Sequence, residues 1–420
     1  MNKGIAAIGA SGLVTVIAWA VSRPAEGTSP ASQIAELCGA LALTALAGML
    51  IIATRARPVD RLFGGMDKAY VVHKWLGVAT FGLLAVHVVI LAVAGPRGQN
   101  QNMLVHAGAP AMVLLLGAVA FALFARRVGY EAWKLVHLLT VAPYAIGVAH
   151  YYGSSSYGPL TASPFSLWLD LANLAGACAA VYVIVFFGRL GLRYAYTVSA
   201  VRPITGDIIE ITAAPVGRPL RFRPGQFAFV QIPRLKFASH PFTVSSGQGE
   251  PLQFTVRARG DDTASLVHHL EVGDRLDVGG PYGGLDYSTG SACQLWIAGG
   301  IGITPFRSFY RSGVPDRFDV DLFYAYEGED GAYLDELRAI DQPNLRVHLI
   351  DAAVQGLLTA GAIVEMAPSD KPRDVYFCGP AAMRNAIHEP LKATGGVSNF
   401  HAEEFGFGRP TKPGWIKADR

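Results

Sequence analysis

The chain has 420 residues, enough for at least two domains, and its charged residues are unevenly distributed. The first 188 residues contain 11 Lys or Arg and 6 Asp or Glu, whereas the remaining 232 contain 24 and 26, which is ordinary for a soluble domain. The net charge of +3 is too small to indicate a nucleic-acid partner, and the four Cys show no disulfide or zinc-like spacing. These numbers exclude a secreted disulfide scaffold, a disordered chain and a purely soluble enzyme.

Six apolar stretches in the first half are each long enough, or nearly so, to cross about 30 Å of hydrocarbon. They cover residues 5–21, 34–54, 70–94, 103–125, 132–151 and 164–187. The sequence therefore predicts an all-α, six-helix transmembrane bundle. The first stretch resembles a signal peptide with an Ala18-Trp19-Ala20 site, but cleavage there would leave five helices, so we expect an uncleaved signal-anchor.

Positive charges alternate from one predicted loop to the next. Loops on one side carry Arg55, Arg57, Arg61, Lys68, Arg126 and Arg127, and Arg189 and Arg193 follow the last helix, whereas the opposite loops carry only Arg23 and Arg97. The positive-inside rule then places both termini and the whole soluble half in the cytoplasm. We expect a multi-pass protein of the cell membrane, in contact with lipid.

Four histidines lie inside the predicted membrane helices, where ionisable side chains are costly. His73 and His87 are 14 residues apart on the third helix, and His137 and His150 are 13 apart on the fifth. Each pair is separated by about 20 Å along its helix, so two neighbouring helices would present two facing His–His couples. A lone intramembrane histidine is usually a packing residue, but two facing imidazoles saturate a haem iron, which suits electron transfer.

The 13-residue spacing would turn His150 about 140° away from His137 on an ideal helix. We therefore expect the fifth helix to be irregular between its histidines, with Pro143 as the cause. The chain has no Cys-x-x-Cys-His motif, so a haem would be held non-covalently. His106 has no partner in this pattern, and it is either an interfacial polar residue or part of an acceptor site.

From Tyr194 onward the pattern changes to short strands and Pro/Gly turns. Runs over 226–231 and 252–256 predict a small antiparallel β-barrel that ends near Tyr287. Later strand-like runs, over 295–298, 320–326, 346–351 and 374–378, alternate with helix-like segments and predict an α/β, Rossmann-like domain with a parallel sheet. We expect a membrane domain over 1–188, a barrel domain over 189–289 and an α/β domain over 290–420.

Two turns of the α/β region have nucleotide-binding character. The turn Gly299-Gly300-Ile301-Gly302-Ile303-Thr304 follows a strand, and its glycines would let the backbone approach a pyrophosphate at a helix N-terminus. Cys378-Gly379-Pro380 closes a later strand at the carboxyl edge of the same sheet, where ligands bind in open α/β folds. Taken alone, either sequence is also compatible with an ordinary tight turn.

The segment His240-Pro241-Phe242-Thr243-Val244-Ser245-Ser246 combines an aromatic ring, hydroxyl groups and a polar or cationic side chain. A flavin needs a ring to stack on, hydrogen-bond donors for its nitrogens and a partner for its phosphates. The segment therefore suggests a flavin site. In isolation, an amphipathic barrel strand would explain it equally well.

Taken together, these residues resemble the NADPH oxidase and ferric reductase transmembrane superfamily over nearly the whole chain. The histidine spacings of 14 and 13 match its bis-haem pattern, and His-Pro-Phe-Thr matches its flavin motif. Gly-Gly-Ile-Gly-Ile-Thr-Pro resembles the nicotinamide-nucleotide motif of ferredoxin–NADP reductases, and Cys-Gly-Pro follows in the expected order.

The resemblance implies a role for each matching residue. His73 and His137 would ligate an inner b-type haem, and His87 and His150 an outer one. FAD would contact the flavin motif and the turn that follows, namely His240, Pro241, Phe242, Thr243, Ser245, Ser246, Arg257, Gly260 and Thr263, although the family commonly has Trp where this chain has Asp262. The dinucleotide would contact Gly299, Gly300, Gly302, Thr304 and Gly379, with Cys378 close to the nicotinamide.

Flavin reductases of this superfamily also place an aromatic ring near the chain end over the flavin. Phe405 is the candidate here, with Phe407 as the alternative and interdomain packing as the ordinary role. The activity implied is transmembrane electron transfer from cytosolic NAD(P)H through FAD and two b-type haems to an outer acceptor. That acceptor would be oxygen, giving superoxide, or a ferric chelate, giving ferrous iron.

The alternative function is a haem-bearing membrane subunit that delivers electrons to a separate partner protein. The first interpretation allows such a partner but does not require one.

The choice of nicotinamide cofactor depends on the residue after strand 320–326, because an acidic side chain there binds ribose hydroxyls and an Arg accommodates a 2′-phosphate. Here Glu327-Gly328-Glu329-Asp330 follows, which favours NADH over NADPH. The alternative is that a distant Arg, such as Arg307 or Arg384, binds the phosphate.

Overall fold

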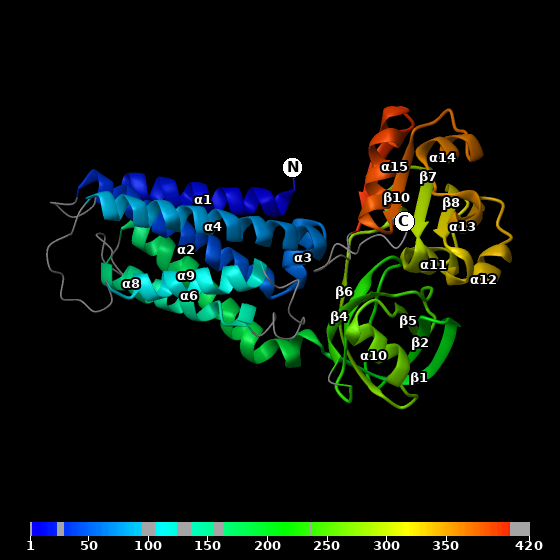
Figure 1. Cartoon of the computed structure of the whole chain (residues 1–420), viewed down its shortest axis with the longest axis horizontal. Coiled ribbons are helices and arrows are strands. Elements are labelled where there is room, and N and C mark those ends of the chain that lie inside the picture. The colour runs from blue at the N-terminus through cyan, green and yellow to red at the C-terminus, as the bar shows by residue number, and fades with distance from the viewer. Residues whose placement is uncertain are drawn as a thin grey trace, which may run out of the picture. The chain divides into compact units, whose positions relative to one another are not determined.

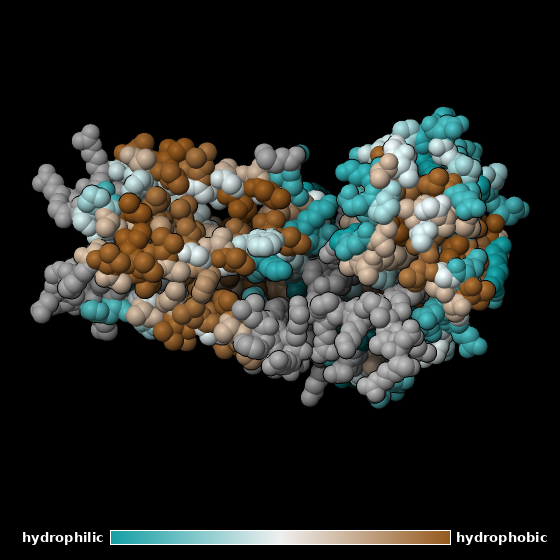
Figure 2. Space-filling view, turned by 45° about the horizontal axis from the view of Figure 1, so that its top comes forward, coloured by the Kyte–Doolittle hydropathy of each residue, from teal (hydrophilic) through white to brown (hydrophobic). Residues whose placement is uncertain are grey.

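The computed structural model describes residues 2–22, 29–94, 106–123, 136–154, 163–235 and 237–403. It divides into two compact units, Met1–Gly191, here the helical unit, and Leu192–Arg420, here the sheet unit. Figure 2 shows hydrophobic side chains over much of the visible face of the helical unit and many hydrophilic ones on the sheet unit. This contrast agrees with the uneven charge distribution in the sequence.

Three predicted spans correspond to the helices α1 (Lys3–Val21), α2 (Pro30–Ala53) and α4 (Met66–Ala94) (Figure 1). A fourth corresponds to α9 (Pro164–Val181), which continues as a π-helix over Tyr182–Gly191. Within the described ranges, these four segments are the helices long and apolar enough to cross a membrane. The short helix α3 (Arg57–Phe63), absent from the sequence prediction, connects α2 to α4 and ends at Gly64 in the left-handed conformation.

The other two predicted spans are only partly described. They contain α6 (Gly108–Leu123) and α8 (Val141–Ser154). Residues 103–105, 124–125 and 132–135 lie outside the described residues, as do Arg23, Arg97, Arg126 and Arg127. The six-helix bundle and its orientation therefore stay predictions.

The fifth predicted span is irregular between its two histidines. After a helical turn over 136–138, the backbone N–H of Thr140 donates to the His137 carbonyl at 3.1 Å, and that of Ala142 donates to the Leu139 carbonyl at 3.0 Å. These bonds join residues three apart, and the regular helix α8 begins at Val141. Pro143 has no N–H and would clash with the Leu139 carbonyl in a continuous helix. The predicted irregularity is confirmed.

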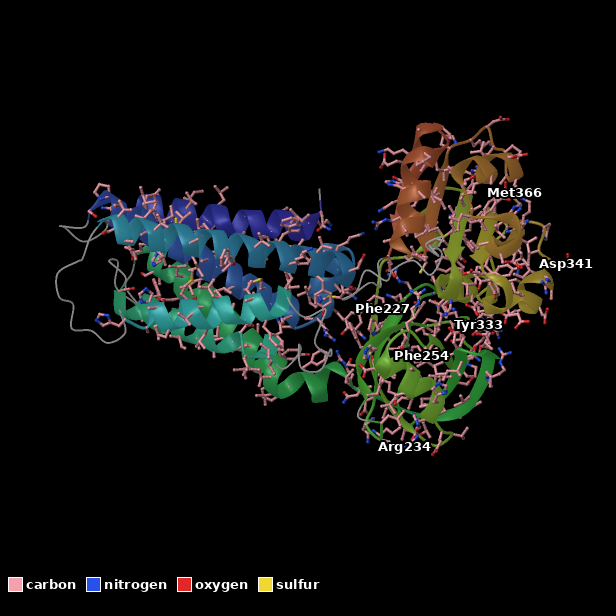
Figure 3. The ribbon with its side chains drawn as sticks, viewed as in Figure 1. Phe227, Arg234, Phe254, Tyr333, Asp341 and Met366 are labelled. Carbon is pink, nitrogen blue, oxygen red and sulfur yellow. The ribbon has the colours of Figure 1, made fainter. Side chains whose placement is uncertain are left out.

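The sheet unit begins with a six-stranded antiparallel sheet. Its strands, in the order β4-β3-β6-β1-β2-β5, are β4 (Phe237–Thr243), β3 (Phe227–Ile232), β6 (Arg275–Tyr282), β1 (Tyr194–Thr205), β2 (Ile208–Pro215) and β5 (Leu252–Arg257). Helix α10 (Asp261–His269) follows β5. Phe254, labelled in Figure 3, is fully buried in the core of this sheet. The antiparallel sheet is confirmed, and its closure into a barrel stays a prediction.

The rest of the sheet unit is built around a five-stranded parallel sheet. The strands, in the order β11-β10-β7-β8-β9, are β11 (Val397–Ala402), β10 (Arg373–Cys378), β7 (Cys293–Gly299), β8 (Asp319–Tyr326) and β9 (Leu345–Asp351). The helices are α11 (Thr304–Arg311), α12 (Leu334–Arg338), α13 (Ala352–Gln355), α14 (Ala360–Met366) and α15 (Ala381–Ala393). The predicted α/β arrangement with a parallel sheet is confirmed.

A buried polar network joins the two sheets. Arg307 of α11 is 1% exposed, and its guanidinium lies 2.9 Å from a carboxylate oxygen of Glu210 on β2 and 3.0 Å from one of Glu336 on α12. The Tyr333 hydroxyl donates to Glu210 at 3.0 Å, and the Arg307 guanidinium lies 4.0 Å from the Tyr333 ring centre. Each buried charge has an opposite charge beside it, which offsets the cost of removing it from water.

Candidate functional site

The helical unit brings the four predicted histidines together as two couples. The ring centres of His73 and His137 are 5.9 Å apart, and those of His87 and His150 are 6.4 Å apart. His73 and His87 lie on α4, His150 lies on α8, and His137 lies in the helical turn before the break at Leu139. The irregular segment thus allows two histidines 13 residues apart to face the same helix.

Backbone carbonyls of α2 hold both histidines of α4. The Nδ1 atom of His73 lies 3.2 Å from the Met49 carbonyl oxygen, and that of His87 lies 2.6 Å from the Ala35 carbonyl oxygen. A carbonyl oxygen can only accept, so each Nδ1 carries the proton and donates it. Each Nε2 then keeps its lone pair, as a metal-ligating imidazole requires. These carbonyl partners were not anticipated, because nothing in the side-chain pattern of α2 indicates them.

The space around the outer couple depends on small residues. A Cβ atom added at Gly108, at the start of α6, would lie 2.9 to 3.1 Å from three ring atoms of His150. A Cβ atom at Gly39 of α2 would lie 3.4 Å from Nδ1 of His87. The two glycines therefore leave room for the imidazoles. His106, which precedes α6, is exposed.

A further polar group lies midway between the couples on α4. Thr80 is seven residues from both His73 and His87 and is 1% exposed. Its hydroxyl has no hydrogen-bond partner within the described parts of the chain. Seven residues are nearly two helical turns, so Thr80 lies close to the same face of α4 as both histidines.

The geometry of the couples fits a metal held between two imidazoles. Metal–imidazole bonds are about 2 Å long and a ring centre lies about 1 Å beyond its nitrogen, so a shared metal would place the two ring centres about 6 Å apart. The described residues contain no cluster of three or more His, Cys, Asp or Glu that could hold a metal with protein ligands alone. Two imidazoles alone would fit a metal whose remaining ligands come from another group, such as the porphyrin of a haem.

In the sheet unit, the flavin motif lies on the edge strand β4. His240, Pro241 and Phe242 are half-buried, and the rings of His240 and Phe242 are nearly parallel at 6.4 Å, with Phe237 4.5 Å from His240. The buried Phe237 ring thus supports the half-buried rings of His240 and Phe242, on which an isoalloxazine could stack. Thr243, at the end of β4, is buried.

The structure places the two serines of the same motif differently. Ser245 and Ser246 are fully buried, the Ser245 hydroxyl accepts from the Thr255 hydroxyl at 2.9 Å, and the Ser246 hydroxyl accepts from the Gln253 backbone N–H at 3.2 Å. Their backbone carbonyls accept from side chains of α11, including Ser308 at 2.7 Å. Both serines therefore have structural partners in the junction between the two sheets.

The turn after β5 is built around Thr263. Its hydroxyl accepts from the backbone N–H groups of Arg259 and Gly260, at 2.9 and 3.1 Å, and caps the start of α10. In the first turn of α10, the Asp262 carboxylate lies 3.6 Å from Nε2 of His240. The position where the family commonly has Trp therefore holds an acidic partner for the histidine of the flavin motif.

Arg257, predicted to support the FAD pyrophosphate, forms ion pairs with two carboxylates. Its Nε lies 2.6 Å from Asp207, and its Nη2 pairs with Asp330 in the turn after β8. A Cβ atom at Gly300 would lie 3.8 Å from Nη1 of Arg257. The side chain thus bridges the antiparallel sheet and the glycine-rich turn of the parallel sheet.

The two nucleotide motifs meet at the carboxyl edge of the parallel sheet. Cys378 pairs with Ala298, so the ends of β10 and β7 lie side by side. Gly299 ends β7, Gly300 has a φ of +55°, and Thr304 begins α11. A Cβ atom at Gly302 would lie 2.2 Å from the Cys378 carbonyl oxygen, so this close approach requires glycine. Gly379 follows Cys378 at the same edge.

Glu403 lies next to this edge and was not identified from the sequence. Its Oε1 atom accepts from the backbone N–H groups of Gly284 and Leu285 at 2.7 and 3.1 Å. Burial raises the pKa of the Cys378 thiol well above its usual range, and the negative charge of Glu403 raises it further.

Phe405 and Phe407, the predicted stacking rings, lie outside the described residues.

The predicted ribose-binding residue Glu327 is exposed at the end of β8. The turn after it is held by Asp351, which accepts from the backbone N–H of Gly328 at 2.9 Å. Arg307 is committed to Glu210 and Glu336 in the buried network, so it is not a free partner for a 2′-phosphate. Arg384 lies on α15 and is half-buried.

These features define a class of protein, a membrane-bound oxidoreductase with FAD-binding and NAD-binding domains. Residues 38–148 match the ferric reductase like transmembrane component family, residues 193–286 an FAD-binding domain family, and residues 296–389 an oxidoreductase NAD-binding domain family. In this order, the three matches and the yeast relative below match the ferric reductase and NADPH oxidase-like superfamily.

Individual relatives match either most of the chain or about half of it. Ferric/cupric reductase transmembrane component 2 of Saccharomyces cerevisiae is 22% identical over 420 residues, which cover 88% of this chain and 56% of the relative. The glycine betaine monooxygenase reductase subunit of Chromohalobacter salexigens is 29% identical over 222 residues, 47% of this chain and 59% of the relative. The chain thus spans just over half the length of these curated relatives.

Among solved structures, a ferredoxin reductase in carbazole 1,9a-dioxygenase aligns with a TM-score of 0.45 and 22% identity. This alignment covers 50% of this chain and 69% of the other.

Proposed function

We propose that this protein transfers electrons across the cell membrane, from cytosolic NAD(P)H through FAD and two b-type haems to an acceptor on the outer side. The observation that carries the proposal is the pair of histidine couples, 5.9 and 6.4 Å between ring centres, in a chain that also has FAD-binding and NAD-binding domains. Together they supply candidate sites for each redox group that such a path requires.

On the membrane side, the imidazoles of His73 with His137 and of His87 with His150 would hold the irons of the two haems. The Met49 and Ala35 carbonyls keep the imidazoles of His73 and His87 in the tautomer and orientation that ligation needs. When bound, FAD would accept a hydride and pass on single electrons, and the haems would carry those electrons across the hydrocarbon.

On the sheet unit, the rings of Phe242 and His240 would support the isoalloxazine and the adjoining phosphates. The N-terminal turn of α10, around Gly260 and Thr263, offers backbone N–H groups near the end of β5, where a pyrophosphate is stabilised. Cys378 and the three glycines of the β7 turn would receive the nicotinamide nucleotide. Cys378 keeps its proton at neutral pH because burial and Glu403 raise its pKa.

Two outer acceptors, oxygen and ferric chelates, are consistent with this arrangement. Irons with two histidine ligands have no free coordination position, so electrons would leave by outer-sphere transfer in either case. A separate partner protein is the alternative acceptor. It is favoured by the names of several relatives that match about half of this chain, which describe reductase subunits or components of monooxygenases.

The test uses the full chain purified in detergent. We expect a pyridine haemochrome assay to give two b-type haems per FAD, and NADH to reduce both flavin and haem as completely as dithionite does. One haem or none per FAD would overturn the proposal. Reoxidation under air, under argon with a ferric chelate, and under argon alone then separates the acceptors, and failure of both small acceptors would favour a partner protein.

A further inference from the structure

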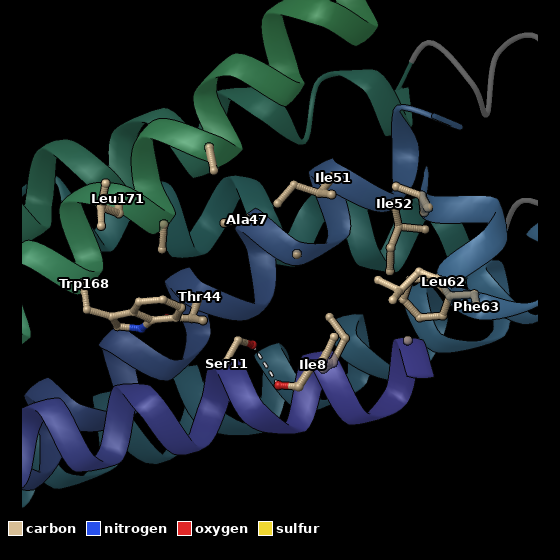
Figure 4. Close-up of a pocket in the computed structure, with 16 residues that line it drawn as sticks. Ile8, Ser11, Thr44, Ala47, Ile51, Ile52, Leu62, Phe63, Trp168 and Leu171 are labelled. Carbon is tan, nitrogen blue, oxygen red and sulfur yellow. Dashed lines mark hydrogen bonds between the residues drawn. The ribbon is translucent and has the colours of Figure 1, made fainter. Parts of the chain in front are cut away.

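The helical unit contains an apolar pocket of about 300 Å³ among α1, α2, α3 and α9. None of the four predicted haem ligands lines it. Figure 4 shows the Trp168 ring at one end of the pocket and Leu62 and Phe63 of α3 at the other, with Ala47 and Ile51 of α2 along the side. The pocket is therefore separate from the proposed electron path.

Small side chains produce this space. Gly4 and Ala7 of α1, Gly48 of α2, and Ala172 and Ala175 of α9 all line the pocket. A Cβ atom at Gly48 would lie 3.3 Å from the Ile8 side chain, so α1 and α2 are close there. Small residues usually allow membrane helices to pack closely, whereas here they border a volume that the protein does not fill.

The polar groups near the pocket already have partners. The Ser11 hydroxyl donates to the Ile8 carbonyl at 2.7 Å (Figure 4), and that of Thr44 donates to the Ala40 carbonyl at 2.9 Å. The indole N–H of Trp168 donates to the Thr15 hydroxyl at 2.8 Å. A polar occupant would lose its water without gaining hydrogen bonds here, whereas a hydrocarbon chain would gain dispersion contacts with the wall.

The pocket is also accessible from the outside of the helical unit. Leu62 and Leu171, which line it, are 39% and 63% exposed. Between Gly4 and Ser11, α1 follows the pocket for about 10 Å. A hydrocarbon chain from the surrounding lipid could enter sideways and lie along this length.

Exposed cations flank the α3 end of the pocket. The Asn2 side chain donates to the Phe63 carbonyl, which ties the start of α1 to the end of α3. Lys3 and Arg61 therefore belong to the same end of the helical unit, and both are exposed and without an ion-pair partner in the described ranges. Basic side chains at a membrane surface attract anionic lipid headgroups, roughly fivefold per cation.

We propose that this pocket binds one acyl chain of an anionic phospholipid, whose phosphate pairs with Lys3 and Arg61. A chain in the pocket exchanges one hydrocarbon environment for another, so specificity comes from contacts with the wall and from the headgroup charge. Gly48 directly precedes Met49, whose carbonyl holds His73. The lipid chain would thus support α2 beside the residue that orients a proposed haem ligand. The lipid site itself does not depend on haem binding.

The test measures lipid retention by native mass spectrometry on the full chain, purified in detergent and stripped of lipid. The probes are phosphatidylglycerol and phosphatidylcholine with identical 14-carbon chains. We expect the parent to retain one phosphatidylglycerol with at least tenfold preference over phosphatidylcholine. Equal retention of the two lipids, or retention of neither, would overturn the proposal.

Two adjacent residues of α9 provide matched variants. Ala175→Phe places a ring at an exposed position that lines the pocket, whereas Leu174→Phe places the same ring at an exposed position that does not line it. Ala175→Phe should weaken phosphatidylglycerol retention at least tenfold, and Leu174→Phe should leave it unchanged. Equal retention by the two variants would contradict the pocket as the binding site. If Ala175→Phe does not fold, Ala7→Leu fills the same space from α1.

The charge is tested separately. The double variant Lys3→Gln with Arg61→Gln keeps the apolar pocket and should lose most of the preference for phosphatidylglycerol while still retaining phosphatidylcholine. An unchanged preference would refute the assigned headgroup site.

Discussion

The two units support their polar side chains in different ways. In the sheet unit, charged side chains pair with one another, as Arg307 does with Glu210 and Glu336. In the helical unit, the histidines of α4 are held by backbone carbonyls of α2. A carbonyl supplies an acceptor without a charge that must be removed from water, which suits an apolar environment. We therefore expect substitution of a histidine to lower the content of the bound group, whereas substitution in the Arg307 network should lower the free energy of unfolding.

The largest expected effect follows replacement of a predicted haem ligand. His87→Leu or His150→Leu removes one of two axial ligands, so we expect the outer haem to be lost and haem content to fall from two per FAD to one. The change leaves no unpaired charge, so FAD content and flavin reduction by NADH should match the parent. Pyridine haemochrome and released-flavin assays on the same samples measure both quantities.

His106→Leu is the control, because His106 is exposed and belongs to neither couple. It should leave haem content unchanged. Loss of FAD together with haem in the His87 or His150 variant would mean that the substitution unfolds the protein.

The next effect concerns the folding of the sheet unit. Arg307→Met leaves the buried Glu210 with only Arg202, a largely exposed cation 3.0 Å away, so we expect the free energy of unfolding to fall by about 3 kcal/mol. Arg311→Gln is a matched control on the same helix, since Arg311 is exposed and pairs with Glu336 and Glu250. Its loss should cost no more than about 1 kcal/mol. Urea titration followed by flavin fluorescence gives both values, and equal midpoints would contradict the role of the network.

The helices and strands that were predicted from the sequence are those that appear in it as local apolar runs. The spans at α1, α2, α4 and α9 and the strands at β3, β5, β7, β8, β9 and β10 all appear, because an apolar run of a given length has few alternatives. The break before α8 was also predictable, since a 13-residue spacing conflicts with a regular helix and Pro143 offers a cause. The short helix α3 was missed because its seven residues carry too little periodic pattern.

The parts of the candidate site that depend on side-chain identity were predicted from the sequence. The parts that depend on backbone atoms were missed. The pairing of His73 with His137 and of His87 with His150 followed from spacing. The Met49 and Ala35 carbonyls could not be predicted, because every residue has a carbonyl and only helix packing selects two of them. Glu403 was missed for a similar reason, since its partners are backbone N–H groups more than 100 residues away.

A smaller effect is expected at the edge of the parallel sheet. Glu403→Gln removes a negative charge near Cys378, so the pKa of the thiol should fall toward its usual value. The pH profile of thiol alkylation should then shift to lower pH. Flavin reduction by NADH should also slow about tenfold, because the backbone N–H groups of residues 284 and 285 lose a charged hydrogen-bond acceptor. Stopped-flow absorbance and timed alkylation measure the two effects. An unchanged alkylation profile would show that the charge of Glu403 does not reach Cys378.

The smallest expected effect is the choice between NADH and NADPH. Glu327 is exposed at the end of β8, where a carboxylate can accept from both ribose hydroxyls but repels a 2′-phosphate. One alternative cation is already removed, because Arg307 is buried against Glu210 and Glu336. We therefore expect kcat/KM for flavin reduction to be several-fold higher with NADH than with NADPH at matched ionic strength.

Glu327→Arg should reverse this preference without disturbing the turn. Asp351 holds the backbone of Gly328, and Arg257 pairs with Asp330, so neither anchor of the turn depends on the Glu327 side chain. Arg384→Gln is the companion variant, because it removes the other predicted phosphate partner. If the parent prefers NADPH and Arg384→Gln abolishes that preference, the 2′-phosphate is bound from α15 and Glu327 belongs to a solvated turn. If the parent prefers NADH and Glu327→Arg alone reverses it, the end of β8 determines which cofactor supplies the electrons.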